Sequence, residues 1–557
     1  MSTPREKYER WLREPTVDEK TKAELRDMND AEIEDAFGED LRFGTGGLRE
    51  VMGPGTNRMN AYTVRRATQG VVNWLKKRNF NRSAVIAYDS RWNSRRFAEE
   101  TASVFIANGI KTYLFEDMRP TPELSFAVRY LKTGTGIIIT ASHNPSQYNG
   151  YKVYSPDGGQ AVPYLADEIT QEIEKIDIFS DVKFDETAKP ITVGKDIDSI
   201  YLEKVSALHK RFGSGLSSRL SILYTPLHGT GIKLVPPALK RVGFNNVRIV
   251  YTQAIPDGAF PTVKLPNPED VHAFDMALKE SDIQDVDIII GTDPDCDRIG
   301  VMVKKQGKFF KLTGNQVGIL LMDYLLRRLK DKGTLPKNGF VVKTIVTTDL
   351  VKEIAKRFDV ELIEVLTGFK FIGEKIKELD DTGRKCFLFG FEESYGYLAG
   401  TFVRDKDAVI AAMLIGDMTS FYLQEGKTLL DRLEEIYEEY GYFTEVLRSI
   451  EFKSLSEKKR MKEIMNKLRN TPPSSIAGMN LSSVVDYSEG IDTLPPSDVL
   501  AFYYGNDFDI KITVRPSGTE PKMKIYFDFK GKKWTKGTRS AEDNFLSKII
   551  GNYSVTN

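Results

Sequence analysis

Short apolar segments alternate with longer amphipathic segments along most of this chain, and that alternation constrains the fold more than any other feature. The apolar segments fall into three groups: Ala84–Tyr88, Thr112–Phe115 and Gly136–Thr140; Leu220–Tyr224, Val247–Tyr251 and Asp287–Gly291; Phe340–Val346, Val360–Val365 and Cys386–Phe389. Each has the length of a buried strand, and the segments between them have the apolar spacing of helices. Strands interleaved with helices form βαβ units. We therefore predict an α/β fold of three consecutive domains with largely parallel sheets.

The two ends of the chain follow different patterns. Dense charge and few helix breakers predict helices over Arg5–Leu12 and Asp18–Phe37. Near the other end, a helix-like KSLSEKKRMKEIMNKL precedes the alternating segments IKITV and KMKIYFDF, and a last helix starts at about Ala541. Such alternation predicts a C-terminal α+β domain with an antiparallel sheet. We place the four domains at residues 1–210, 211–325, 326–448 and 449–557.

The charge balance and the cysteine content exclude several classes of protein. Lys+Arg and Asp+Glu number 79 each among the 557 residues, and a net charge of zero disfavours broad binding to nucleic acid or anionic membranes. Two cysteines, Cys296 and Cys386, cannot build a disulfide framework and favour a reducing compartment. The charged start is unlike a signal peptide, and no apolar run approaches about 18 residues. We expect a cytoplasmic protein that binds neither nucleic acid nor membranes.

The loop TASHNP follows the apolar segment GIIIT and contains Ser142. Ligands usually bind at the carboxyl ends of strands in α/β sheets, so Ser142 is well placed to act as a nucleophile. A serine hydroxyl needs a base or a prior modification. His143 is adjacent in sequence, but neighbouring side chains of an extended segment point to opposite faces, which weakens a simple Ser142–His143 dyad. By itself the loop is more typical of an ST-turn that ends a strand.

Three aspartates, Asp293, Asp295 and Asp297, follow the apolar segment VDIII at alternate positions. They converge on one cation only if the loop curls around it. An EF-hand would require a glycine and a carboxylate where this chain has Arg298 and Lys304, so that motif is excluded. Three acids without a complete protein cage suit Mg²⁺. Because like charges after a buried strand are costly without a cation, we favour a Mg²⁺ site over a solvated acidic turn.

Two further loops have polar groups that suit a sugar phosphate. Glu392 and Ser394 in GFEESYG, with RDKD from Arg404 to Asp407 nearby, suit hydrogen bonds to vicinal hydroxyls or general acid–base catalysis. Acids in the first turn of a helix explain the same residues equally well. The loop RPSGTEPK combines cationic and hydroxyl donors with a glycine, which suits a phosphate monoester better than a plain connection. Its spacing excludes a Walker A motif.

In this order, the loops resemble those of the α-D-phosphohexomutase family, which includes phosphoglucomutases and phosphomannomutases. The matching segments are TASHNPSQYNGYKVY, GTDPDCDR, GFEESYGY and RPSGTEPK, with FGTGGLRE, YTPLHGTG, FPTVKLPNPE and LTGFKFIG. The resemblance covers nearly the whole chain from about residue 40 and implies four domains around one central cleft. The extended GFEESYGYL and the helical N-terminus are most similar to the longer branch, which also includes phosphopentomutases and glucose-1,6-bisphosphate synthases.

The resemblance also implies roles for the residues that match the family's motifs. Ser142 would carry a phosphoryl group, and Lys152 would act as general acid and base, with Arg49 and His143 near the transferring phosphoryl group. A phosphoserine oxygen and three carboxylates would hold Mg²⁺, namely those of Asp293, Asp295 and Asp297. Sugar and phosphate contacts would come from Arg298, Gly368, Lys370, Glu392, Ser394, Arg515, Ser517, Gly518, Thr519 and Lys522.

We therefore predict an enzyme that interconverts glucose 1-phosphate and glucose 6-phosphate through a phosphoserine and a glucose 1,6-bisphosphate intermediate. We expect it to be a monomer or a small homo-oligomer whose partners are small sugar phosphates. One alternative is a pentose or mannose phosphomutase that uses the same residues. Another is a metal-dependent phosphatase with Asp293 as the nucleophile. A third is a protein that binds sugar phosphates without turning them over.

Overall fold

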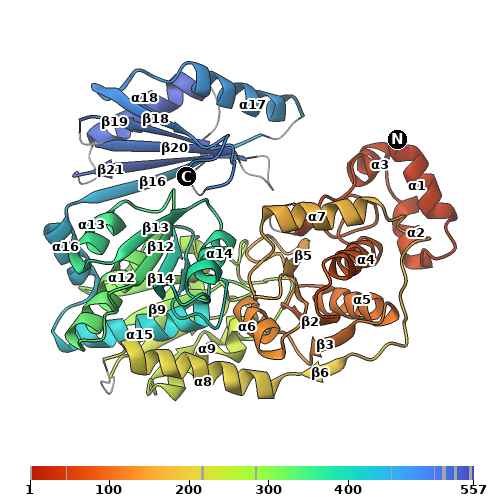
Figure 1. The fold of residues 1–557 in the computed structure, drawn as a ribbon, viewed down its shortest axis with the longest axis horizontal. Helices are drawn as coiled ribbons and strands as arrows, with labels where there is room; N and C mark the ends of the chain where they lie inside the picture. Colours follow the sequence, from red (N-terminus) through yellow and green to blue (C-terminus); the bar gives the residue numbers. More distant parts are fainter. Residues whose placement is uncertain are drawn as a thin grey trace.

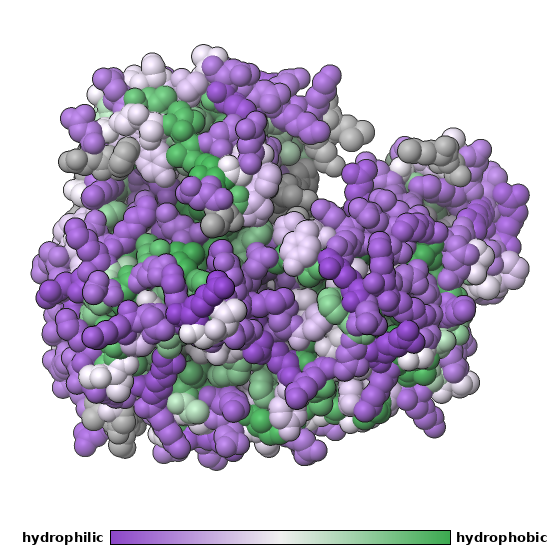
Figure 2. Space-filling view, viewed as in Figure 1, coloured by the Kyte–Doolittle hydropathy of each residue, from purple (hydrophilic) through white to green (hydrophobic). Residues whose placement is uncertain are grey.

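Four sheets, each with its own helices, divide the molecule into domains I to IV (Figure 1). The computed structural model describes residues 3–44, 47–214, 219–282, 285–452, 455–492, 494–506, 509–516, 522–531, 536–550 and 555–556. Figure 1 places domain IV, in blue, apart from the N-terminal helices, in red. Figure 2 shows the surface hollowed between these two lobes.

Domain I begins with three short helices, α1 (Pro4–Arg13), α2 (Glu19–Arg26) and α3 (Asp30–Phe37). The single helix predicted over Asp18–Phe37 is wrong. Asn29 interrupts it, because its side chain accepts hydrogen bonds from the main chain of Ala31 and Glu32, while the Glu32 carboxylate accepts the N–H of Asn29. This capping box starts a new helix.

A six-stranded sheet forms the centre of domain I, in the order β1-β5-β4-β2-β3-β6. Strands β2, β3, β4 and β6 are parallel to their neighbours in this group, whereas β5 runs antiparallel to β1 and β4. The strands are β1 (Leu48–Val51), β2 (Ser83–Tyr88), β3 (Lys111–Phe115), β4 (Thr135–Ile139), β5 (Tyr148–Tyr154) and β6 (Ile191–Val193). The helices are α4 (Ala61–Lys77), α5 (Ser94–Ala107), α6 (Thr121–Leu131), α7 (Pro163–Glu174) and α8 (Lys195–Phe212).

Domain II has the strand order β11-β10-β9-β7-β8, with β7 parallel to β8 and β9. Its strands are β7 (Ile222–Thr225), β8 (Val247–Ile249), β9 (Ile288–Thr292), β10 (Ile299–Lys305) and β11 (Lys308–Lys311). Its helices are η1 (Thr230–Lys233), α9 (Val235–Arg241), α10 (Tyr251–Ala254), η2 (Val271–Phe274) and α11 (Asp275–Ser281). The predicted strand Val247–Tyr251 ends early because α10 starts at Tyr251.

Domain III has the strand order β13-β12-β14-β15, with β12 parallel to β13 and β14. Its strands are β12 (Gly339–Thr344), β13 (Glu361–Val365), β14 (Cys386–Glu392) and β15 (Gly396–Leu398). Its helices are α12 (Gly314–Asp331), α13 (Leu350–Phe358), α14 (Phe369–Leu379), α15 (Ala408–Gln424) and α16 (Leu429–Tyr440). Helix α15 is buried along most of its length and packs against α8, α9 and α12.

Domain IV has an antiparallel sheet in the order β17-β18-β19-β20-β21-β16-β22. Its strands are β16 (Phe443–Glu451), β17 (Ser475–Ile476), β18 (Met479–Asp486), β19 (Leu500–Tyr504), β20 (Ile510–Pro516), β21 (Lys522–Lys530) and β22 (Val555–Thr556). Its helices are α17 (Leu455–Asn470) and α18 (Lys536–Ile550). The predicted fold class, three mixed α/β domains followed by an α+β domain, is confirmed.

The boundaries drawn from the sequence at 210/211, 325/326 and 448/449 each fall inside an element, namely α8, α12 and β16. We therefore describe the domains by their sheets. One hydrophobic core includes side chains of domains I, II and III, and domains I, II and IV each have a further core of their own. Within the part of the chain that the structure describes, every helix is too short or too polar to cross a membrane.

Candidate active site

The predicted nucleophile, Ser142, lies in the loop after β4 and is 3% exposed. Its hydroxyl donates a hydrogen bond of 2.6 Å to Oδ2 of Asp293, in domain II, and lies 3.2 Å from Nδ1 of His143. The φ of Ser142 is +51°, in the left-handed region. Because the loop is not extended here, the expectation that Ser142 and His143 point to opposite faces does not hold.

The three aspartates after β9 are all buried, and their carboxylates offer oxygens within 4.8 Å of one another. Cys296, between two of them, has a φ of +53°, so the loop curls as a metal site requires. The main-chain N–H groups of Asp297 and Arg298 donate to Oδ1 of Asp293 at 3.1 and 2.9 Å. Among the described residues, Oδ1 of Asp295 and Oδ1 of Asp297 accept no hydrogen bond. Buried carboxylate oxygens without donors fit a divalent cation.

Two lysines lie against this cluster of aspartates. Lys152, on β5, donates to Oδ2 of Asp295 at 2.9 Å and lies 3.6 Å from Oδ2 of Asp297. Lys406, from domain III, lies 2.9 Å from the same oxygen of Asp297. Burial and the two neighbouring carboxylates raise the pKa of Asp293 well above its usual range. Burial opposes ionisation of Asp295 as well, but Lys152 holds the pKa of that carboxyl below its usual range.

Arg49 and His143 both contact residues of the nucleophile loop. Arg49, on β1, donates to Oδ1 of Asn144 at 3.2 Å. Burial, followed by the charges of Arg298 and Arg49, lowers the pKa of His143 well below its usual value. The imidazole is therefore neutral near pH 7 and can accept or donate a hydrogen bond, depending on its tautomer.

The predicted sugar-binding residues lie on domains II and III. Glu392 is the last residue of β14 and is buried, and Ser394 follows in the turn before β15. Burial raises the pKa of Glu392, while the charges of Lys406 and Arg298 oppose that shift. Arg298 forms an ion pair with Glu269, of domain II.

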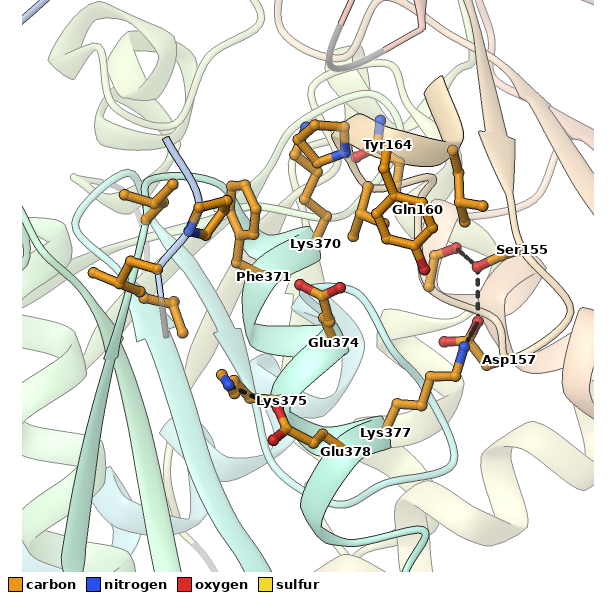
Figure 3. A pocket seen from close by; sticks show the side chains of 18 of the residues that line it. Ser155, Asp157, Gln160, Tyr164, Lys370, Phe371, Glu374, Lys375, Lys377 and Glu378 are labelled. Carbon is orange, nitrogen blue, oxygen red and sulfur yellow. Dashed lines mark hydrogen bonds and ion pairs between the residues drawn. The ribbon is translucent and has the colours of Figure 1, made fainter. Parts of the chain in front are cut away.

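The start of α14 carries the other predicted sugar contacts. Gly368 precedes the helix with a φ of +122°, a conformation that favours glycine. Burial, and next the charge of Arg515, lower the pKa of Lys370 to about 8. Lys370 also lines a cavity of about 860 Å³ between domains I, III and IV, where it and Glu374 lie across from Gln160 and Tyr164 (Figure 3). Ser142 and the three aspartates do not line this cavity.

The predicted phosphate loop lies in domain IV, between β20 and β21. Arg515, near the end of β20, pairs in register with Lys524 of β21, and Lys522 is the first residue of β21. The structure therefore places both ends of the loop. Ser517, Gly518 and Thr519 lie outside the described residues.

Comparison with known proteins identifies the family. Models for domains I, II and III of phosphoglucomutase/phosphomannomutase, each described as an alpha/beta/alpha domain, match residues 40–179, 199–307 and 313–440. The chain belongs to this family. Its members are phosphohexomutases, enzymes that isomerise sugar phosphates by phosphate transfer.

Individual phosphohexomutases are similar over most of the chain. A phosphoglucomutase of Staphylococcus haemolyticus (strain JCSC1435) is 39% identical over 507 residues, which cover 88% of this chain and 91% of that protein. A phosphoglucomutase/phosphomannomutase family protein of Burkholderia thailandensis has the same fold, with a TM-score of 0.69, 16% identity, and coverage of 93% and 99%. The Aspergillus fumigatus N-acetylphosphoglucosamine mutase, solved with GlcNAc-6P and magnesium, has a TM-score of 0.54 at 14% identity, with coverage of 92% and 96%.

Several residues at this phosphohexomutase site were not singled out from the sequence. Thr121, the first residue of α6, donates its hydroxyl hydrogen to Oδ2 of Asp295 at 2.9 Å. Lys406 belongs to the RDKD segment, whose charge pattern was noted but not assigned. Asp89 and Arg91 follow β2 and bond to the nucleophile loop. The sequence feature that could have indicated Asp89 and Arg91 is a pair of opposite charges directly after an apolar strand.

Proposed function

We propose that this phosphohexomutase interconverts glucose 1-phosphate and glucose 6-phosphate by phosphoryl transfer through Ser142. The observation that carries the proposal is the hydrogen bond of 2.6 Å between Ser142 Oγ and Asp293, with Lys152 on the adjacent Asp295. A nucleophile, a cation-binding cluster and a proton carrier therefore lie at one junction between domains I and II. The relative named phosphoglucomutase, at 39% identity, supports glucose as the sugar.

The aspartate cluster fits Mg²⁺ because two of its buried carboxylate oxygens lack hydrogen-bond donors among the described residues. Asp293, Asp295 and Asp297 would hold the ion. When bound, it would neutralise charge on the carboxylates and on the phosphoryl group. The fungal mutase solved with a sugar phosphate and magnesium is consistent with this assignment.

The proposed cycle has two transfers. In the first, the phosphoryl group of phospho-Ser142 moves to the free hydroxyl of the bound sugar monophosphate, so the bond from serine oxygen to phosphorus breaks as the new bond forms. Lys152, in its neutral amine form, takes up the proton that this hydroxyl releases and so becomes the ammonium ion. The product is glucose 1,6-bisphosphate. After the sugar turns around, Ser142 accepts the other phosphoryl group, and the proton returns to the sugar oxygen.

The remaining residues have binding roles in this proposal. Neutral His143 and cationic Arg49 lie beside the transferring group and stabilise its charge. Glu392 and Ser394 bind sugar hydroxyls, and Arg298 lies beside them. Arg515, Lys522 and the loop between them bind the phosphate that is not transferred, and the positive charge of Arg515 acts on Lys370 across the domain III–IV boundary. The cytoplasmic location and the oligomeric state remain predictions.

The test is ³¹P NMR of the purified protein with Mg²⁺ and trace glucose 1,6-bisphosphate. Glucose 1-phosphate, mannose 1-phosphate and ribose 1-phosphate are supplied in separate tubes. We expect conversion of glucose 1-phosphate to be by far the fastest, and preference for another sugar would overturn the substrate assignment. Ser142→Ala should abolish turnover, whereas Ser146→Ala, in the same loop, should retain it. Release of inorganic phosphate alone would instead indicate a phosphatase.

A further inference from the structure

The loop that contains Ser142 holds an uncommon backbone conformation. Ser142 has a φ of +51°, and residues other than glycine adopt the left-handed region only at an energetic cost. Such a conformation persists when surrounding contacts determine it. The contacts that determine it here come from a segment outside the loop, the residues that follow β2.

Arg91 supplies the largest set of these contacts. Its side chain is 0% exposed, and its guanidinium donates to four main-chain carbonyl groups of the nucleophile loop. Nη1 donates to the oxygens of Pro145 at 2.8 Å and Tyr148 at 3.1 Å. Nη2 donates to the oxygen of Ser142 at 2.5 Å and to that of Asn144. One planar group therefore fixes the loop at Ser142 and over the residues that follow it.

A second chain of hydrogen bonds reaches the same loop from Asp89. Its Oδ2 accepts the hydroxyl of Thr140 at 2.6 Å, and the Thr140 hydroxyl oxygen accepts the N–H of Ser142 at 2.8 Å. Asp89 also accepts the N–H of Arg91 at 2.9 Å and lies 3.3 Å from its Nε. The carbonyl of Ser142 is therefore bonded directly to Arg91, and its N–H is linked to Asp89 through the hydroxyl of Thr140.

The same guanidinium contacts domain II, which carries the aspartate cluster. The Cζ atom of Arg91 lies 4.9 Å from the centre of the Phe260 ring. The domain II segment before it approaches so closely that a Cβ on Gly258 would lie 2.4 Å from the N atom of Trp92 and 2.9 Å from the carbonyl carbon of Arg91. Arg91 therefore contacts the loop of Ser142 and also, through Phe260, the domain that carries Asp293.

We propose that Arg91 is a positioning residue for phosphoryl transfer, which sets the placement of Ser142 Oγ relative to Asp293 through the carbonyl groups of the nucleophile loop and through Phe260. This inference rests on the proposed role of Ser142. Lysine cannot substitute, because an ammonium group lacks the planar fork that reaches several carbonyl groups at once. Since misplacement of a reacting group by about 1 Å costs on the order of 100-fold in rate, the role has a measurable size.

The test compares Arg91→Lys with the wild-type protein. We expect kcat to fall about 100-fold while KM changes less than about threefold, because the sugar contacts are intact. Transfer of ³²P from labelled glucose 1,6-bisphosphate to Ser142 should slow by the same factor, and the ³¹P resonance of phosphoserine should shift. Guanidinium or ethylguanidinium should partly restore the kcat of Arg91→Ala. Phe260→Leu, a milder change, should lower kcat by a smaller factor.

The matched control is Arg432→Lys, because Arg432 is also buried but pairs with Asp323 and Glu435 inside domain III. It should lower the melting temperature and leave kcat unchanged. The inference is overturned if Arg91→Lys keeps kcat within about threefold of wild type, or loses it only in proportion to the unfolded fraction. If the wild-type protein itself takes up no label on Ser142, the proposed function fails instead, so the two failures are distinguishable.

Discussion

Buried charged groups gather at two junctions of the molecule, and they are arranged in opposite ways. Between domains I and II, the aspartate cluster leaves carboxylate oxygens without donors among the described residues. Between domains III and IV, the lysines are matched: Lys343 lies 2.6 Å from Asp349 and 2.9 Å from Glu364, and Lys511, from domain IV, donates to the main-chain oxygen of Ile345 at 2.9 Å. The first junction, where three aspartates converge, is suited to bind an ion and reactants, whereas the paired lysines of the second junction join domains III and IV, with Oδ1 of Asp528 left without a donor among the described residues.

The apolar cores follow the same division. One core runs through parts of domains I, II and III and includes Cys296 of the aspartate loop and Phe391 beside Glu392, while domains I and II also have further cores of their own. Domain IV has its own core and reaches the shared one through side chains such as Tyr487 and Tyr526. We therefore expect substitutions at the junction of domains I and II to change kcat. Substitutions beside the phosphate loop of domain IV should change KM, and those at the junction of domains III and IV should change stability.

The largest effect should come from Asp293→Asn. Loss of this carboxylate removes both the partner of Ser142 and part of the cation site, so kcat should fall about 1000-fold with little change in stability. Steady-state kinetics measure kcat, and titration calorimetry measures the affinity for Mg²⁺. Asp285→Asn, on an exposed residue of the same domain, is the control. Retention of both activity and Mg²⁺ affinity would contradict the assignment.

Arg515→Met should act on binding rather than on chemistry. A charge-assisted hydrogen bond to phosphate contributes about 1.5–3 kcal/mol, so KM should rise about 10- to 100-fold. The kcat at saturating substrate should change much less. Lys462→Met, on an exposed residue of α17, should leave both constants unchanged. A fall in kcat without a change in KM would place Arg515 at the reacting centre and remove the contrast between the two ends of the site.

The pH dependence of KM should also distinguish the phosphate-binding residues from the reacting centre at Ser142. The pKa of Lys370 is lowered to about 8 by burial and next by Arg515, so this side chain loses its positive charge as the pH rises through about 8. KM for the sugar phosphate should therefore rise several-fold between pH 7 and pH 9. Lys370→Met should have a raised KM that no longer changes over this range. Lys356→Met, an exposed change in the same domain, should retain the wild-type profile.

The smallest effect should appear in stability, at the junction of domains III and IV. Burial and next the carboxylate of Asp528 raise the pKa of Glu445 from 4.5 to about 8. The folded protein therefore holds a proton that the unfolded chain releases, so stability falls as the pH rises from 4.5 towards 8. Glu445→Gln should remove this dependence and stabilise the protein by about 1 kcal/mol at pH 8.5.

Urea unfolding at pH 5 and pH 8.5 measures this difference. Glu489→Gln, on an exposed residue of domain IV, provides the comparison and should follow the wild-type protein at both pH values. An equal loss of stability in Glu445→Gln at both pH values would show that the carboxyl is needed in its charged form.

The elements of the fold were predictable where a strong local pattern decided them. The predicted segments Thr112–Phe115 and Val360–Val365 differ by one residue from β3 and β13. The predicted helix Asp18–Phe37 failed because hydrophobic spacing continues across Asn29, whereas the break depends on the hydrogen bonds of one side chain. The domain boundaries drawn from the sequence lie within α8, α12 and β16, and hydrophobic spacing does not show that these elements are continuous there.

The site was predictable where its residues are contiguous in sequence. The loops at Ser142 and Asp293 are compact motifs, and the structure brings them into contact. The sequence did not predict roles for Arg91, Thr121 and Lys406. Each belongs to no motif in its own segment and approaches the site only through the folding and packing of the domains. No local spacing can show contacts between residues that are separated by 51 to 174 positions.

The burial of α15 has a consequence for synthesis on the ribosome. This helix, Ala408–Gln424, completes the packing around α8 and α9, which are translated some two hundred residues earlier. Until it emerges, the nascent chain exposes apolar surface that it cannot yet cover, so we expect it to be prone to aggregation during that interval. A chain that ends before residue 408 should aggregate. A chain that ends after α16 should fold into domains I to III and lack domain IV with its phosphate loop.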